Sequence, residues 1–292
     1  MTSRFLFLTT VFFLGTSHAV YTHEAHYLFS PGTAAPQVSA VRYTHGGNGG
    51  KWLHGIRKHA PKGPIIMGRH YKTFSYKDSC GRLWNTNFAQ EEDVATLNTA
   101  YQRLLKEKRA EQVVLVGVSR GAATAFGFLA NNPTCIRAAV LESPFDSVDS
   151  ALDKNVHRIF RAPQKRLSKT LNKQVLPRIF GRYRPDGPSP IEFVAQISHD
   201  MPILLVCSRK DTIVPMGSTI ALYNKLRATG HNNAHLLILE QSMHGLVNRN
   251  SSDGILYRNV THAFYKAYNL PHNDNWATAG ETAFLKTQPV EV

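Results

Sequence analysis

Short apolar segments recur along the chain, and segments with helical periodicity separate them. The clearest apolar segments are QVVLV at 112–116, RAAVL at 137–141, PILLVC at 202–207 and AHLLIL at 234–239. Because they do not alternate with polar residues, they are typical of strands that are covered on both faces. Strands that alternate with helices predict an α/β fold, with a mostly parallel, doubly wound sheet and helices on both faces.

Apolar residues at helical spacing predict the elements between these strands. Helices are expected at 88–109, 122–131, 216–229 and 255–268. Further strands are expected nearer the N-terminus, at 26–30, at 40–44, and at 64–67 or 71–76. Residues 271–292 are polar and aperiodic, and they are predicted to form a loose C-terminal tail.

The first residues of the chain have the pattern of a targeting segment. A basic start, Met1–Arg4, precedes the apolar run Phe5–Gly15, and the small residues Ser17 and Ala19 follow. This pattern predicts a signal peptide over residues 1–19, cleaved after Ala19, and a periplasmic or secreted protein. The alternative is an uncleaved N-terminal membrane anchor. The main domain is then expected to span residues 20–270.

The segment Gly117–Gly121 (GVSRG) contains a candidate nucleophile. It directly follows the apolar strand and opens a predicted helix. In that context G-x-S-x-G forms a sharp turn that presents the serine hydroxyl above the sheet. Ser119 is therefore the predicted nucleophile, although a tight turn with an ordinary helix-capping serine would give the same five residues.

A serine hydroxyl needs a base, and the base needs an orienting acid. Asp211 follows the strand at 202–207, and His244 follows the strand at 234–239, so both are expected at the carboxyl edge of the sheet. The order serine, aspartate, histidine is the one expected after a nucleophile turn of this kind. We therefore predict a triad of Ser119, His244 and Asp211, with Glu142 and Asp146 as rival acids.

These motifs resemble those of the α/β-hydrolase superfamily. The chain is similar to the compact serine hydrolases grouped with prolyl-oligopeptidase and serine-aminopeptidase relatives. The segments that carry the resemblance are 117–122, 141–145, 211–215 and 243–245, within about Tyr27–Tyr268. The resemblance implies a serine hydrolase that works through an acyl-enzyme on a carboxylic ester or thioester. The alternatives are a peptidase or aminopeptidase acting on amides, and a non-catalytic binding protein on the same fold.

The same resemblance implies an oxyanion hole with two backbone donors. One is the N–H of Arg120, the residue after the nucleophile. The other comes from a loop after an earlier strand, for which two segments compete. Gly32–Thr33 follows the predicted strand at 26–30, which favours Thr33, whereas His45–Gly46–Gly47 resembles an H-G-G motif and makes Gly47 the alternative.

The superfamily inserts its cap where this chain interrupts its strand–helix alternation, at about residues 147–196. Between Lys154 and Arg184 the chain has ten Lys or Arg residues and no acidic residue, within a net charge of +14. Such a basic amphipathic stretch can bind an anionic membrane surface, form a positive rim that attracts anionic substrates, or remain a solvated face. No zinc spacing, RNA-binding signature or helix-turn-helix pattern indicates nucleic-acid binding.

The sequence contains no convincing metal site, since it has no H-E-x-x-H motif and no cysteine pair at ligand spacing. No cofactor is expected either, because a triad supplies its own nucleophile, base and orienting acid. Of the three cysteines, Cys207 is expected to pack as a small apolar residue. Cys80 and Cys135 lie in loop-like contexts and could form a disulfide after export. The sequence does not specify the oligomeric state.

Overall fold

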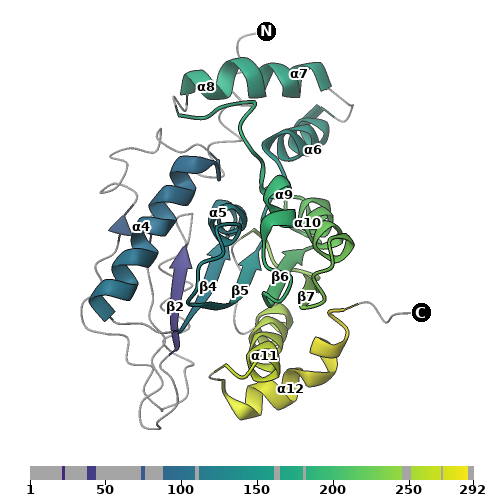
Figure 1. Cartoon of the computed structure of the whole chain (residues 1–292). Helices are drawn as coiled ribbons and strands as arrows, with labels where there is room; N and C mark the ends of the chain where they lie inside the picture. The colour runs from purple at the N-terminus through teal and green to yellow at the C-terminus, as the bar shows by residue number, and fades with distance from the viewer. Residues whose placement is uncertain are drawn as a thin grey trace.

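A five-stranded parallel sheet forms the centre of the computed structural model (Figure 1). Its strands are β2 (Val38–Tyr43), β4 (Gln112–Val118), β5 (Ile136–Glu142), β6 (Ile203–Ser208) and β7 (Ala234–Leu239), in the order β2-β4-β5-β6-β7. Two short strands, β1 (Thr22–His23) and β3 (Phe74–Ser75), form a separate antiparallel pair. The structure describes residues 22–23, 38–43, 74–75, 88–108, 112–160, 165–179, 182–244, 251–270 and 272–288.

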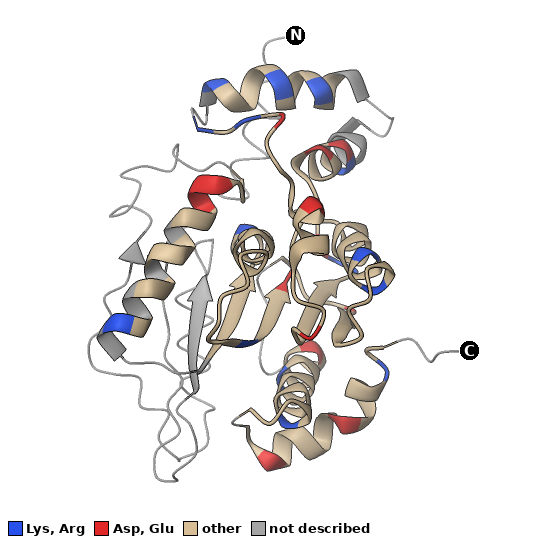
Figure 2. Cartoon of the chain, in the orientation of Figure 1, with Lys and Arg blue, Asp and Glu red and all other residues tan. Residues whose placement is uncertain are grey.

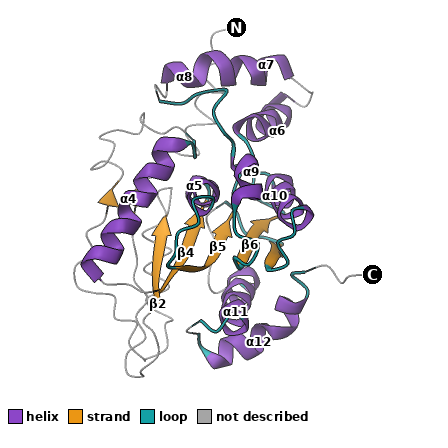
Figure 3. Ribbon diagram, viewed as in Figure 1, coloured by secondary structure: helices purple, strands orange, loops and turns teal. Residues whose placement is uncertain are grey.

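Helices cover both faces of the sheet, as Figures 1 and 3 show. One face carries α4 (Glu91–Lys108), α5 (Arg120–Leu129) and α10 (Met216–Ala228). The other face carries α11 (Ser252–Ala267) and α12 (Asp274–Leu285). This arrangement confirms the predicted doubly wound α/β fold.

Successive side chains of the described strand β4 enter different cores. In β4, Val113 and Leu115 pack with Leu97 and Phe126 of the helices on one face. Val114 packs on the other side, in the core that α11 closes. Successive residues of a strand face opposite sides of the sheet. A strand that is apolar throughout therefore needs helices on both sides of the sheet.

Between β5 and β6 the chain forms a helical segment. It contains α6 (Val148–Phe160), α7 (Lys165–Thr170), the π-helical turn η2 (Leu171–Val175), α8 (Leu176–Ile179), α9 (Pro190–Phe193) and the 3₁₀ turn η3 (Val194–Gln196). The helices α7 and α8 lie beyond α6, away from the sheet (Figure 1). The buried Leu152, Leu171 and Tyr183 give this segment a small core of its own.

Several basic side chains of this segment form ion pairs. Arg182 lies 2.9 Å from Glu92 and Arg184 lies 3.8 Å from Glu91, both in the acidic first turn of α4 (Figure 2). These side chains are exposed, so each pair contributes little to stability. They nevertheless compensate part of the positive charge of the segment. Binding of anionic substrates or lipid by the basic stretch stays a prediction.

The predicted loose tail is wrong for residues 272–288. Asp274–Leu285 form the helix α12, and Asn273 caps it by accepting a hydrogen bond from Trp276 N–H at 3.0 Å. A Cβ at Gly280 would collide with the backbone carbonyl of Asn259, so the two helices approach closely at this glycine. The packing of α12 on α11 is a tertiary effect, which the polar composition of the segment does not reveal.

Other expectations fall partly outside the described residues. The signal peptide, the strand at 26–30 and Cys80 lie outside them. Cys135 and Cys207 both have free thiols. Cys207 is buried as expected, and burial raises the pKa of its thiol to about 12. Among the helices that the structure describes, none has the length and apolar character needed to cross a lipid bilayer.

Candidate active site

The turn between β4 and α5 has the geometry that the G-x-S-x-G motif predicts. Ser119 adopts φ 57° and ψ −123°, a backbone conformation that residues with a side chain rarely occupy. Strain of this kind persists only where the surrounding structure enforces it. Two residues before Ser119, Gly117 lies so close to α5 that a Cβ there would be 2.7 Å from Ala122 Cα.

Replacing Gly117 with alanine is therefore expected to lower the free energy of unfolding by about 1–3 kcal/mol and to reduce activity. The added methyl group meets backbone atoms, which cannot rotate away, so the turn that carries Ser119 must shift. Gly127→Ala is the matched control within α5, because its Cβ would meet side-chain atoms of Val94 and Phe193 and no backbone atom. Urea unfolding and turnover measurements compare the two variants. Equal effects at both positions would contradict a special role for Gly117.

His244 lies between Ser119 and Asp211 and forms a hydrogen bond to each. Its Nε2 is 2.8 Å from Ser119 Oγ, and its Nδ1 is 2.7 Å from Asp211 Oδ2. An ionised carboxylate only accepts hydrogen bonds, so Nδ1 carries the proton toward Asp211. In the neutral imidazole, Nε2 is then the acceptor for the hydroxyl proton of Ser119. The three residues that the sequence singled out therefore meet in the order that serine activation requires.

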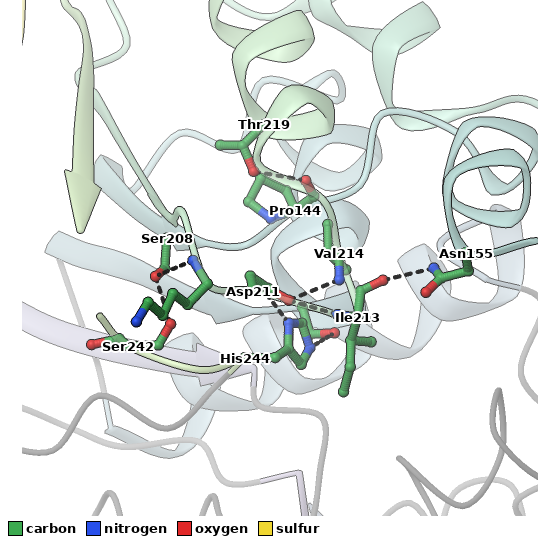
Figure 4. Close-up of polar contacts among 11 residues, drawn as sticks. Pro144, Asn155, Ser208, Asp211, Ile213, Val214, Thr219, Ser242 and His244 are labelled. Atoms are coloured by element: carbon green, nitrogen blue, oxygen red, sulfur yellow. Dashed lines mark hydrogen bonds and ion pairs between the residues drawn. The ribbon is translucent and has the colours of Figure 1, made fainter. Parts of the chain in front are cut away.

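Asp211 is buried and receives hydrogen bonds from its own loop. Its Oδ1 accepts the backbone N–H groups of Ile213 and Val214, each at 2.9 Å (Figure 4). Burial raises the pKa of Asp211, but the hydrogen bond and charge interaction with His244, together with hydrogen bonds from Ile213 and Ser143, lower it more. Its pKa thus lies below its usual range, and the group is an ionised acceptor at neutral pH.

The loop of Asp211 is also held from outside. Asn155 of α6 donates from Nδ2 to the carbonyl of Ile213 at 3.0 Å (Figure 4). Thr219, near the start of α10, donates to the carbonyl of Pro144 at 3.1 Å. The segment between β5 and β6 thereby contacts the acid loop directly. Sequence reasoning did not find Asn155, because a buried asparagine in a basic amphipathic stretch carries no motif.

The rival acids do not contact the histidine in this arrangement. Glu142 ends β5, and its backbone carbonyl accepts the N–H of Ser119 at 2.8 Å. The carbonyl of Asp146 accepts the N–H of Ile191 at 3.2 Å. Asp211 is the carboxylate that the structure places on His244.

The expected first oxyanion donor belongs to Arg120, the first residue of α5. Backbone N–H groups at a helix start point out of the helix end and favour developing negative charge. The guanidinium of Arg120 is buried, with Nε 3.8 Å from Asp93. The guanidinium of Arg120 is therefore turned to Asp93, and the backbone N–H is the donor expected at the oxyanion. The two candidates for the second donor, Thr33 and Gly47, lie outside the described residues.

Within the described ranges, no group of three or more His, Cys, Asp or Glu side chains is placed to hold a metal ion. An activated hydroxyl beside a helix start can attack a carbonyl carbon and stabilise the oxyanion that forms.

A comparison with family models places the chain in a family. The model described as the prolyl oligopeptidase family matches residues 66–269, more than half of the 292 residues. A search of curated proteins finds no match.

Solved structures with a similar arrangement include both peptidases and an esterase. The acylaminoacyl peptidase of Pyrococcus horikoshii is 16% identical, with a TM-score of 0.47, over 69% of this chain and 31% of that chain. The esterase Pf2001 of Pyrococcus furiosus is 17% identical, with a TM-score of 0.46, over 61% of this chain and 62% of that chain. A puromycin-hydrolyzing peptidase of Mycobacterium tuberculosis is 17% identical, with a TM-score of 0.44, over 60% of this chain and 25% of that chain. The chain thus spans less than two thirds of the length of each.

Proposed function

The chain belongs to the prolyl oligopeptidase family of serine hydrolases, and we propose that it cleaves a carboxylic ester or thioester through an acyl-enzyme formed on Ser119. The observation that carries this proposal is the pair of hydrogen bonds that join Ser119 to His244 and His244 to Asp211. A hydroxyl with a base at hydrogen-bond distance, and a base with an orienting carboxylate, are the two requirements of serine nucleophiles.

In the proposed reaction, Ser119 Oγ attacks the substrate carbonyl while its proton passes to His244 Nε2. The oxyanion of the tetrahedral intermediate accepts a hydrogen bond from Arg120 N–H. Collapse of the intermediate breaks the bond to the leaving group, which takes the proton from His244. Water then attacks the acyl-enzyme by the same route in reverse, with His244 as base, and releases the acid and free Ser119.

Amide cleavage is the second candidate, and the family match favours it, because the family is named for an oligopeptidase. The two reactions share the attacking hydroxyl and differ in the leaving group. An amine is a poor leaving group and must be protonated as it departs, whereas an alkoxide or thiolate leaves more readily. A site that cleaves amides is therefore expected to cleave the matching esters too, and ester hydrolysis is the more general proposal.

Export is part of this proposal, supported by the apolar run Phe5–Gly15 and the small residues before position 20. The full-length chain, expressed in a secreting host, is expected to yield a mature protein that begins at Val20. Recovery of a membrane-bound protein that still begins at Met1 would favour the N-terminal anchor instead.

A substrate panel tests the reaction class. Acyl esters, acyl thioesters and aminoacyl or peptidyl amides with a common reporter group are compared at equal concentration, with Ser119→Ala as the control. We expect Ser119-dependent turnover of esters and thioesters that exceeds the turnover of amides. A higher kcat/KM on amides would make the protein a peptidase. A folded wild type that turns over no member of the panel would favour a binding protein on a hydrolase fold.

A further inference from the structure

A second carboxylate, Asp253, lies behind the segment that leads to His244. It belongs to the first turn of α11 and is 4% exposed. Its Oδ1 accepts the backbone N–H of Glu240 at 3.2 Å. Its Oδ2 accepts the N–H of Gln241 at 2.8 Å, the N–H of Ser242 at 2.6 Å and the hydroxyl of Ser242 at 2.8 Å. One side chain thus holds three successive residues.

These contacts are more than the usual preference for an acid at a helix start. An acidic side chain in a first turn is stabilised by the helix dipole and commonly faces solvent. In α11 the cap is Ser251, whose hydroxyl accepts the N–H of Gly254 at 3.1 Å. Asp253 instead faces the loop after β7. Burial raises the pKa of Asp253, but the hydrogen bonds from Gln241, Ser242 and Glu240 lower it below its usual range, so it remains a charged acceptor.

The clamped segment is tied to the rest of the site at its other end. The carbonyl of Ser242 accepts a hydrogen bond from Ser208 Oγ at 2.5 Å (Figure 4). Ser208 is the last residue of β6, three positions before Asp211. His244 follows Ser242 by two residues. The position of the imidazole therefore depends on a segment that α11 holds through Asp253 and that β6 holds through Ser208.

We propose that Asp253 is a positioning residue of the active site, which fixes residues 240–242 so that His244 stays within reach of both Ser119 and Asp211. It touches no reacting atom and transfers no proton. The effect of Asp253 on the rate of hydrolysis rests on the proposed function. Its effect on the position of residues 240–242 does not. A displacement of about 1 Å at a reacting group is enough to cost about a hundredfold in rate.

Three variants in the full chain separate this role from simple helix stability. Asp253→Asn keeps the side-chain shape but removes the charge and one acceptor oxygen. Ser242→Ala removes one of the four hydrogen bonds and leaves the backbone contacts intact. Ser251→Ala removes the cap of α11 but keeps the hydrogen bonds that Asp253 accepts from residues 240–242, and it is the matched control.

The first measurement is amide hydrogen exchange, which needs no activity. We expect the N–H groups of Gln241 and Ser242 to exchange about tenfold or more faster in Asp253→Asn, with a smaller change in Ser242→Ala and none in Ser251→Ala. Unchanged exchange in Asp253→Asn would overturn the proposal, whatever the protein hydrolyses. If Asp253→Asn does not fold, exchange at Gln241 and Ser242 is compared between Ser242→Ala and Ser251→Ala. A faster exchange in Ser242→Ala alone supports the proposal, and no difference overturns it.

The second measurement is the rate of covalent labelling by a fluorophosphonate probe, together with kcat and KM on an ester. Asp253→Asn is expected to lower the labelling rate and kcat by about 10–100-fold with little change in KM, because the base is misplaced while substrate contacts remain. Ser251→Ala is expected to label like wild type below its unfolding temperature. Equal losses of labelling rate and kcat in Asp253→Asn and Ser251→Ala would show that Asp253 only stabilises α11. A wild-type protein that the probe does not label refutes the proposed function. Hydrogen exchange then still decides whether Asp253 fixes residues 240–242.

Discussion

Ser119→Ala and His244→Ala are each expected to lower kcat on an ester by about 10⁶, and the double variant is expected to lose no more than either single one. The reason is that Ser119 Oγ and His244 Nε2, 2.8 Å apart, act as one unit. Removing either partner removes the same proton transfer. Steady-state kinetics on purified variants measures the effect, with circular dichroism to show that each variant is folded.

Asp211→Asn is expected to cost less, about 10⁴ in kcat, because the histidine remains but loses its orienting carboxylate. Asp146→Asn is the matched control, since Asp146 follows the neighbouring strand but does not contact His244. We expect its kcat to stay near the wild-type value. A double variant of Ser119 and His244 whose loss of kcat is the product of the two single losses would contradict the assigned roles. A larger loss of kcat in Asp146→Asn than in Asp211→Asn would contradict them too.

Acidification from pH 7 to pH 5 is expected to lower the free energy of unfolding by about 2 kcal/mol for each of two histidines, the buried His235 and the partly buried His262. Burial lowers the pKa of His235 to about 4, with a further contribution from the charge of Arg227. Burial also lowers the pKa of His262 to about 4, with contributions from His272 and Arg258. Both residues hold α12 against the rest of the domain.

The hydrogen bonds explain why these histidines fold as neutral side chains. His262 Nδ1 accepts the N–H of Asn273, 2.9 Å away. Thr287 Oγ1 donates to the carbonyl of Phe284, so it accepts from His235 Nδ1–H at 2.9 Å. His235 Nε2 is then left to accept from the hydroxyl of Tyr268 at 2.8 Å. Protonation of His262 Nδ1 breaks its hydrogen bond, because the backbone N–H of Asn273 can only donate. Protonation of His235 Nε2 makes it a donor, so the hydroxyl of Tyr268 must turn to accept.

The sign of the effect follows from the direction of the pKa shifts. A histidine whose folded pKa lies below its unfolded value of about 6.5 stabilises the fold fully above that value, and this stability is lost as the pH falls toward about 4. Urea unfolding at pH 7, 6 and 5 measures the loss. His235→Gln is expected to remove about 2 kcal/mol of this loss. A free energy of unfolding that is the same at pH 7 and pH 5 would show that these histidines are not excluded from protonation in the folded state.

Sequence patterns predicted the central sheet because strands that are buried on both faces are continuous apolar runs. The run at 234–239 became β7 without change, and the other three runs became strands whose ends moved by one or two residues. The site was predictable for a related reason. Residues that follow different parallel strands meet at one edge of the sheet, so Ser119, Asp211 and His244 could be brought together before any coordinates were known.

What the sequence did not reveal depends on contacts between distant segments. The helix α12 lacks a clear apolar stripe, and its close approach to Asn259 at Gly280 and the stacking of Phe284 on His235 are visible only in three dimensions. Asp253 looks in sequence like any acid at a helix start. Asn155 lies in a basic stretch and is buried, but a buried asparagine carries no motif in the sequence.

Ser119 is expected to be a nucleophile activated by His244, and active-site labelling measures this most directly. The wild-type protein is treated with a fluorophosphonate probe, digested, and examined by mass spectrometry. We expect one adduct per chain, on Ser119, that is absent in Ser119→Ala and formed far more slowly in His244→Ala. A folded wild type that stays unmodified, or an adduct that forms equally in Ser119→Ala, would contradict the account.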